Sequence, residues 1–173
     1  MRVLGVDPGT IVTGFGVIED AGGEARLVEC GVIRAPAKQP IERRLLLIYE
    51  GLLNLVTRHR PDAVAVEEPF VVHAPRNAAM AVGEARAMAL LAAAQRGLAI
   101  SQYPPARVRS TVANYGAGDK EQVRLALTLQ LGVDLNAYPL DATDALAVAL
   151  CHLRHVALDA MMGSERVSAR GRR

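Results

Sequence analysis

The first part of the chain has the hydrophobic pattern of short strands. Residues 2–7 alternate weakly around apolar side chains and stop at Pro8-Gly9, which predicts a buried strand followed by a tight turn. Residues 14–19 and 25–33 predict two more strands, and Ala21-Gly22-Gly23 between them is typical of a hairpin turn. The chain is therefore expected to open with three antiparallel strands.

Helices and strands then alternate. Leu45, Ile48, Leu52 and Val56 recur on one face of residues 41–59, which predicts an amphipathic helix. The continuous apolar run that ends at Glu67 predicts a parallel strand covered on both faces. The other elements predicted are helices over 77–96, 106–114, 120–131 and about 140–156, and a strand over 100–103. This order predicts an α/β fold with a five-stranded mixed sheet and helices on both faces.

Length and charge predict one domain with a basic tail. The chain has 173 residues, of which 51% are hydrophobic, so one domain over residues 1–158 can bury a substantial core. The net charge is only +2, but five arginines follow Cys151 and face only Asp159 and Glu165. We interpret residues 159–173 as a flexible arm that touches phosphates. A solubilising tail without a partner is an equally open alternative.

The two cysteines and the absence of targeting signals indicate a cytoplasmic protein. Cys30 and Cys151 lie far apart, which excludes a metal–thiolate site and argues against a disulfide framework. Asp7 follows the N-terminus too closely for a secretory signal, and we expect no membrane span, since no apolar run approaches the roughly 20 residues that one requires. We expect a protein of the reducing cytoplasm with no membrane partner.

Four carboxylates occupy positions that suggest a shared site. Asp7 and Glu67 each end an apolar strand, and sites in open α/β sheets gather beyond the carboxyl ends of the strands. Asp141 and Asp144 are three residues apart at the start of the last predicted helix, so they share a face. Asp141 alone is also a reasonable helix N-cap. Buried carboxylates without partners are costly, so we expect them to bind a metal ion.

The type of ligand favours magnesium or manganese over zinc, because hard divalent cations prefer oxygen donors. Two such ions about 4 Å apart can activate a water molecule and stabilise the leaving oxygen of a phosphodiester. Glu68 competes with Glu67 for the role on the strand, but adjacent residues of a strand point to opposite sides. We choose Glu67 because it continues the apolar run, while Glu68 begins the exit loop before Pro69.

Three motifs in order resemble RuvC, the family of bacterial Holliday-junction resolvases. They are Val6-Asp7-Pro8-Gly9-Thr10 with Thr13-Gly14-Phe15-Gly16-Val17, then Ala65-Val66-Glu67-Glu68-Pro69-Phe70, then Asp141-Ala142-Thr143-Asp144-Ala145-Leu146-Ala147. Each motif is weak alone, since Asp-x-Gly-Thr also opens actin-like ATPases. All three at this chain length are specific. The sequence departs from the family at Ile11, where a basic residue is common, and at Glu68-Pro69, which replaces a less acidic pair.

The resemblance implies a ribonuclease-H-like fold and a homodimer that makes paired symmetric nicks in four-way (Holliday) junction DNA. It implies that Asp7, Glu67, Asp141 and Asp144 are catalytic ligands of two Mg²⁺ ions, with Mn²⁺ able to substitute. It also implies that the branch-migration proteins RuvA and RuvB are partners.

The resemblance further matches Arg109 and Lys120 to basic groups near the site, with Lys120 also catalytic. It matches Phe70 to an aromatic side chain that contacts bases. The alternatives are a solvated lysine at a helix start for Lys120 and a loop anchor on the core for Phe70. A stripe of small residues at Ala79, Gly83 and Ala87 suits either core packing or a dimer face. His152 and His155 are interpreted as a structural pair rather than metal ligands.

Three other functions are consistent with parts of the sequence. A ribonuclease-H-like nuclease acting on RNA shares the opening motif, but the Asp-x-x-Asp pair and the length favour the junction enzyme. An actin-like nucleotide-binding protein needs two such domains, and this chain has room for one. A non-catalytic junction-binding module has no reason to keep four desolvated acids together.

Overall fold

The computed structural model describes residues 1–68, 76–113 and 120–170, without the side chains of 76–78 and 163–170. The elements are β1 (Arg2–Asp7), β2 (Val12–Asp20), β3 (Ala25–Arg34), α1 (Ile41–His59), β4 (Ala63–Glu67), α2 (Arg76–Ala94), β5 (Ala99–Tyr103), α3 (Pro105–Ala113), α4 (Lys120–Leu131), the short 3-10 helix η1 (Leu135–Ala137) and α5 (Leu140–Arg170). Every predicted strand and helix is present, with boundaries that shift by at most two residues except at the end of α5.

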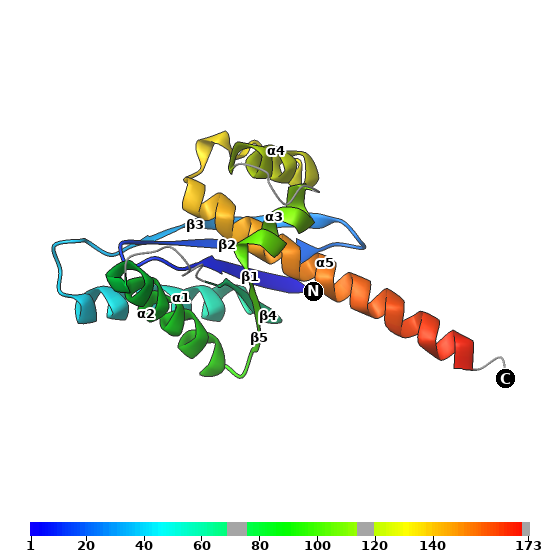
Figure 1. The fold of residues 1–173 in the computed structure, drawn as a ribbon, viewed down its shortest axis with the longest axis horizontal. Helices are drawn as coiled ribbons and strands as arrows, with labels where there is room; N and C mark the ends of the chain where they lie inside the picture. The colour runs from blue at the N-terminus through cyan, green and yellow to red at the C-terminus, as the bar shows by residue number, and fades with distance from the viewer. Residues whose placement is uncertain (69–75, 114–119, 171–173) are drawn as a thin grey trace.

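The five strands form one mixed sheet in the order β3-β2-β1-β4-β5. β1 pairs with β2 antiparallel and with β4 parallel, and β5 continues the parallel half. Helices α1 and α2 cover one face, and α3, α4 and α5 cover the other (Figure 1). This confirms the predicted α/β architecture with helices on both faces.

Strand alternation divides the core into two clusters. In β1, Val3 packs with α3, α4 and α5, whereas Leu4 and Val6 pack with α1 and α2. In β4, Ala65 belongs to the first cluster and Val66 to the second. The core is almost entirely aliphatic, as the near absence of aromatic residues requires.

Three glycines let α5 lie directly on the sheet. A Cβ atom added at Gly5 would lie 2.1 Å from the backbone oxygen of Ala145, and one at Gly14 would lie 1.9 Å from that of Asp141. A Cβ atom added at Gly16 would lie 2.7 Å from the side chain of Leu146. Gly5 and Gly16 are directly opposite each other in the β1–β2 pair. The helix therefore approaches these two strands more closely than any side chain would allow.

Helix α5 corrects two expectations. It continues to Arg170, so the predicted end near Val156 was wrong, and residues 159–170 are helical here. The division into a domain and a tail at residue 158 remains a prediction. Residues 140–162 are also long and apolar enough to span a membrane by composition, with a mean hydropathy of 1.4, contrary to the expectation that no such run exists. Half of that segment is buried in the body against the sheet, as a core helix would be.

Candidate active site

The first two carboxylates meet because their strands are parallel neighbours in register. Val6 lies beside Val66, so Asp7 and Glu67 follow side by side at the carboxyl edge of the sheet. Asp7 is on the same face as Val3, and Glu67 is on the same face as Ala65, so both point towards α5. By the same alternation Glu68 is directed to the opposite face. The geometry thus agrees with the choice of Glu67.

The other two carboxylates come from the first turn of α5. Gly14 lies opposite Asp7 in the sheet, and the backbone oxygen of Asp141 sits directly over Gly14. This contact brings the N-terminus of α5 to the end of β1. Asp144, one turn further along, lines the same cleft as Asp7 and Glu67. Asp141 does not line that cleft, but its charge still raises the pKa of Asp7.

The carboxyl groups are buried close enough together to perturb one another. Burial, followed by the charge of Glu67 and a hydrogen bond with it, raises the pKa of Asp7 to about 8. Burial also raises the pKa of Glu67, although the hydrogen bond from Asp7 and the charges of Lys120 and Arg109 oppose this. In the absence of a cation, the carboxyl group of Asp7 therefore keeps its proton near neutral pH, and its O–H donates a hydrogen bond to Glu67.

Two cations lie in the same cleft. Lys120 Nζ forms an ion pair of 2.7 Å with Asp144 Oδ2, and this hydrogen bond raises the pKa of Lys120. Arg109, from α3, and Lys120, from α4, line the cleft of about 190 Å³ with Asp7, Glu67 and Asp144. The structure therefore brings together five of the seven residues singled out in the sequence. Asp141 is adjacent, and Phe70 lies outside the described residues.

A buried threonine shapes the turn that follows Asp7. Thr13 is completely buried, and its Oγ1 donates a hydrogen bond of 2.7 Å to the carbonyl oxygen of Gly9. This bond closes the turn between β1 and β2 and so orients the end of β1. Sequence reasoning noted Thr13 only as part of a motif. Its position four residues after Gly9, at the start of a buried strand, was the available signal.

The donor set fits a hard divalent cation, although the side chains are not arranged to hold one as they stand. In the part of the chain that the structure describes, no three His, Cys, Asp or Glu side chains form a ready metal site. Asp144 is engaged by Lys120, and Asp7 is hydrogen-bonded to Glu67. The pKa of Asp7 is raised first by burial and then by the charges of the neighbouring carboxylates, and a divalent cation would offset both effects.

The two histidines of α5 have protein partners, as expected for a structural pair. The Nδ1 of His152 is 2.8 Å from the hydroxyl of Tyr103, and burial lowers the pKa of this histidine. His155 contacts Arg107 and Asp159. The core alternative for the small-residue stripe was wrong at Gly83 and Ala87. A Cβ at Gly83 would meet none of the residues that the structure describes within 4 Å, and Ala87 is exposed.

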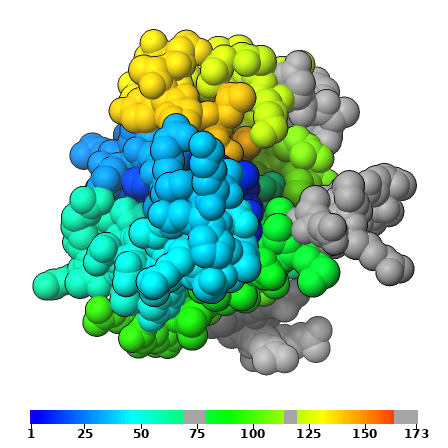
Figure 2. All heavy atoms as spheres, turned by 90° about the vertical axis from the view of Figure 1, so that its left-hand side faces the viewer, coloured from blue at the N-terminus to red at the C-terminus, as the bar shows by residue number. Residues whose placement is uncertain are grey.

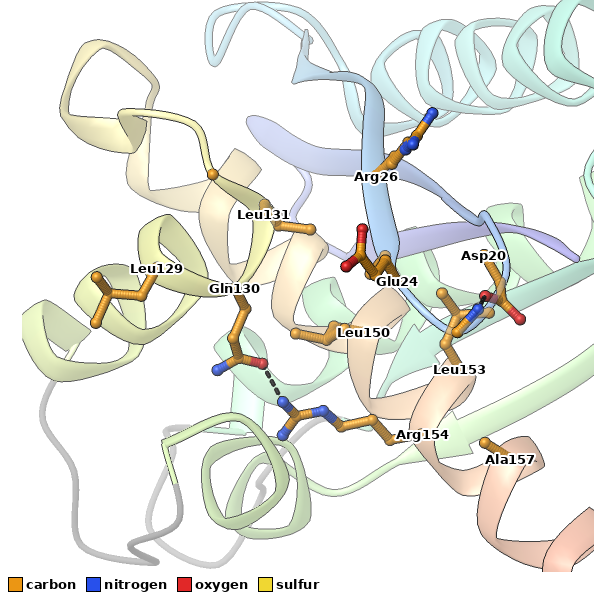
Figure 3. A pocket seen from close by; sticks show the side chains of 13 residues that line it. Asp20, Glu24, Arg26, Leu129, Gln130, Leu131, Leu150, Leu153, Arg154 and Ala157 are labelled. Carbon is orange, nitrogen blue, oxygen red and sulfur yellow. Dashed lines mark hydrogen bonds between the residues drawn. The ribbon is translucent and has the colours of Figure 1, made fainter.

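A larger pocket of about 580 Å³ lies between the β2–β3 hairpin, α4 and α5 (Figure 3). It is at the other end of the sheet, since Asp20 and Ala25 flank the hairpin turn opposite the carboxylate edge. The guanidinium of Arg154 in this pocket is already bound to Gln130 and to the backbone of Thr111. The carboxylate cleft is therefore the better candidate for chemistry.

The raised pKa of Asp7 predicts that the metal-free protein becomes less stable as the pH rises. Asp7 binds its proton more tightly in the folded protein than in the unfolded chain. Its contribution to the free energy of unfolding is therefore complete below about pH 4 and is lost as the pH rises through about 8. We expect the free energy of unfolding of the metal-free protein to fall by a few kcal/mol between about pH 5 and about pH 9. Urea unfolding in excess chelator measures this. The Asp7→Asn protein should show a flatter dependence; an identical slope would contradict the assignment.

Comparison with known proteins supports a single family. The family model described as "Crossover junction endodeoxyribonuclease RuvC" matches residues 3–152. A protein of that name from Dehalococcoides mccartyi is 46% identical over 157 residues, covering 90% of this chain and 93% of the relative. One from Chloroflexus aggregans is 47% identical over 152 residues, covering 88% and 92%.

Solved structures agree with this match. The structure described as T. thermophilus RuvC in complex with Holliday junction substrate superposes with a TM-score of 0.82 at 33% identity, covering 91% of this chain and 96% of that one. The yeast mitochondrial Holliday junction resolvase Ydc2 has a TM-score of 0.65 at 13% identity, a likeness of fold alone. The five-stranded mixed sheet with these neighbours is the expected ribonuclease-H-like fold.

Proposed function

Since this chain belongs to the crossover junction endodeoxyribonuclease RuvC family, we propose that it is a structure-selective endonuclease that resolves four-way DNA junctions by paired symmetric nicks. The observation that carries this proposal is the cleft where carboxylates from β1, β4 and α5 meet two cations. Such a cleft has acids to hold a divalent metal and cations to hold the phosphate. The T. thermophilus relative in complex with a Holliday junction supports the choice of substrate.

Divalent metal, with Mg²⁺ as the natural ion and Mn²⁺ as a substitute, completes this site in our proposal. Asp7, Glu67, Asp141 and Asp144 would hold two ions, since all four offer the oxygen donors that these cations prefer. When bound, the ions supply an activated water molecule and stabilise charge at the phosphate. To hold an ion, Asp7 would have to be without its proton, and Asp144 would have to be free of its bond to Lys120.

Lys120 and Arg109 then act on the DNA. Both come from the helices that form one side of the cleft, α4 and α3. Lys120, released from Asp144, places its ammonium group where negative charge grows on the scissile phosphate. Arg109 binds a phosphate oxygen of the same strand. Phe70 is proposed to contact bases beside the cut.

Paired nicks require two copies of the site, and we propose a homodimer. On α2, a side chain at Gly83 would contact none of the described residues, and Ala87 is exposed, so this face of the helix is open to a second copy. Small residues there allow two helices to approach closely. The family further suggests RuvA and RuvB as partners, and an enzyme acting on chromosomal junctions would work in the cytoplasm.

The experiment is cleavage of a synthetic four-way junction with Mg²⁺, compared with a linear duplex and a structured RNA. We expect two symmetric nicks that yield ligatable duplexes from the junction alone. A heterodimer of one wild-type and one Asp7→Asn chain should nick once and fail to resolve the junction. Cleavage of the RNA in preference to the junction would overturn the proposal, and so would full resolution by the heterodimer in one binding event.

A further inference from the structure

We propose that Arg34, Lys38 and Arg43 form a second phosphate-binding surface, the basic edge, which holds the backbone of a junction's duplex arm about four base pairs from the cut. Arg34 ends β3, Lys38 lies in the loop after it, and Arg43 is in the first turn of α1. This inference rests on the proposed function, because it concerns the part of the same DNA junction that extends beyond the carboxylate cleft.

Register places the basic edge beside the carboxylates. Asp7 lies opposite Gly14, Gly14 opposite Val32, and Arg34 follows two residues later on the same strand. Since β1 and β3 run in the same direction, both end at one edge of the sheet. Two strand spacings and two residues separate Arg34 from Asp7, or about 12 Å. At 3.4 Å for each base pair this corresponds to about four base pairs.

Arg34 is also on the correct face. Val12 and Arg34 are directly opposite each other, two residues before Gly14 and two after Val32 in their strands. Alternation therefore puts Arg34 on the face that carries Asp7. In Figure 2 the segment that ends β3 and begins α1, in light blue and cyan, stands forward, with the dark blue of the N-terminal strand beside it.

The segment is tied to the turn that follows Asp7. The backbone N–H of Ala35 donates to the carbonyl oxygen of Ile11 at 2.9 Å, and Ala35 is buried. Arg44 Nη1 donates to the carbonyl oxygen of Thr10 at 3.3 Å. These bonds hold the basic edge at a constant distance from the carboxylates, so a duplex bound there is positioned relative to the cut.

The positive charges of the basic edge are not neutralised by ion pairs within the described part of the chain. Arg34, Lys38 and Arg43 are all exposed, and none forms an ion pair there. Several other cations are paired, for example Arg2 with Glu19 and Arg58 with Glu29. Residues 34–44 hold four basic residues against Glu42, a net charge of +3 in a chain whose total is +2.

A polyanion with regularly spaced charges is the partner that this pattern fits. Unpaired surface cations gain little from isolated ions, but each phosphate contact releases counterions from DNA and so favours binding. The N-terminus of α1, which has no side-chain cap, adds the positive end of its dipole to the same edge. Arg26 provides a matched control. It is an exposed arginine on the same strand about 26 Å away, near the hairpin.

The first test uses the two lysines of the chain, Lys38 and Lys120, as probes. The Asp7→Asn protein is acetylated with and without a four-way junction, and modification of each amine is read by mass spectrometry. We expect the junction to slow both lysines about fivefold or more, and to leave the α-amine of Met1 at the opposite edge unaffected. If Lys120 is protected but Lys38 is not, the basic edge is overturned while the proposed function stands. Protection of neither overturns the proposed function, and equal protection of all three amines overturns the basic edge.

The second test compares Arg34→Ala with Arg26→Ala, and adds the triple variant Arg34→Ala/Lys38→Ala/Arg43→Ala. Salt titrations of junction binding should give a slope smaller by about 1 for Arg34→Ala and by up to about 3 for the triple variant. Arg26→Ala should match wild type in both the slope of the salt titration and the cleavage rate at saturating DNA. A triple variant with the wild-type slope overturns the inference, and so does one that loses cleavage at saturation while binding normally.

Discussion

The Asp7→Asn protein is expected to bind a four-way junction within a few-fold of wild type and to cleave it at least about 10³-fold more slowly. Asn has the shape of Asp but cannot supply a negative charge to a cation. Removal of that charge also eases the approach of phosphates, so binding should not suffer. Glu67→Gln, Asp141→Asn and Asp144→Asn should behave in the same way. Gel shift and single-turnover cleavage measure the two properties separately.

Glu68→Gln is the matched control for Glu67→Gln. The two residues are adjacent, but strand alternation directs Glu68 to the face opposite Asp7, and the backbone N–H of Glu68 is paired with Tyr103. We expect its cleavage rate to remain close to that of wild type. If Glu68→Gln were the more damaging of the two, the carboxylate of β4 would be wrongly assigned. A near-full rate in any of the four variants would remove that residue from the site.

Gly14→Ala is expected to destabilise the protein by about 3 kcal/mol and to reduce cleavage strongly. The added methyl group would lie 1.9 Å from the backbone oxygen of Asp141, so α5 must move away from β2. Its first turn carries Asp141 and Asp144, and the displacement would separate them from Asp7 and Glu67. Urea unfolding and a cleavage assay on the folded fraction measure the two effects.

Gly83→Ala makes the same chemical change in open space and serves as the control. A methyl group there meets none of the described residues within 4 Å, and Ala favours a helix over Gly by about 1 kcal/mol. This variant should be as stable as wild type or slightly more stable; only stability is compared, because Gly83 also lies on the proposed dimer face. Wild-type stability and activity in Gly14→Ala would mean that close contact between α5 and the strand does not assemble the site.

The hydrophobic pattern was sufficient for the local elements, because each has a clear period and clear stops. Residues 41–59 have a strong apolar face and end before Pro61, and the predicted helix has the bounds of α1. The end of α5 could not be predicted in this way. The predicted tail is basic and contains Gly and Ser, yet the Ala, Leu, Met, Glu and Arg residues among 157–170 propagate a helix well once it has begun. Gly163 and Ser164 are too weak as breakers to end it.

The sequence by itself determined the chemical character of the site: four acids at the ends of predicted elements, two nearby cations and an order of motifs found in one family. It also favoured Glu67 over Glu68, since alternation along a strand is a local property. Only the tertiary structure decided that Asp7 and Glu67 are adjacent, because strand neighbours and register depend on pairing between distant segments. It alone showed that Gly5, Gly14 and Gly16 admit α5 to the sheet, and that Lys120 holds Asp144. Close packing and pKa values depend on which atoms meet, and a one-dimensional pattern does not contain that information.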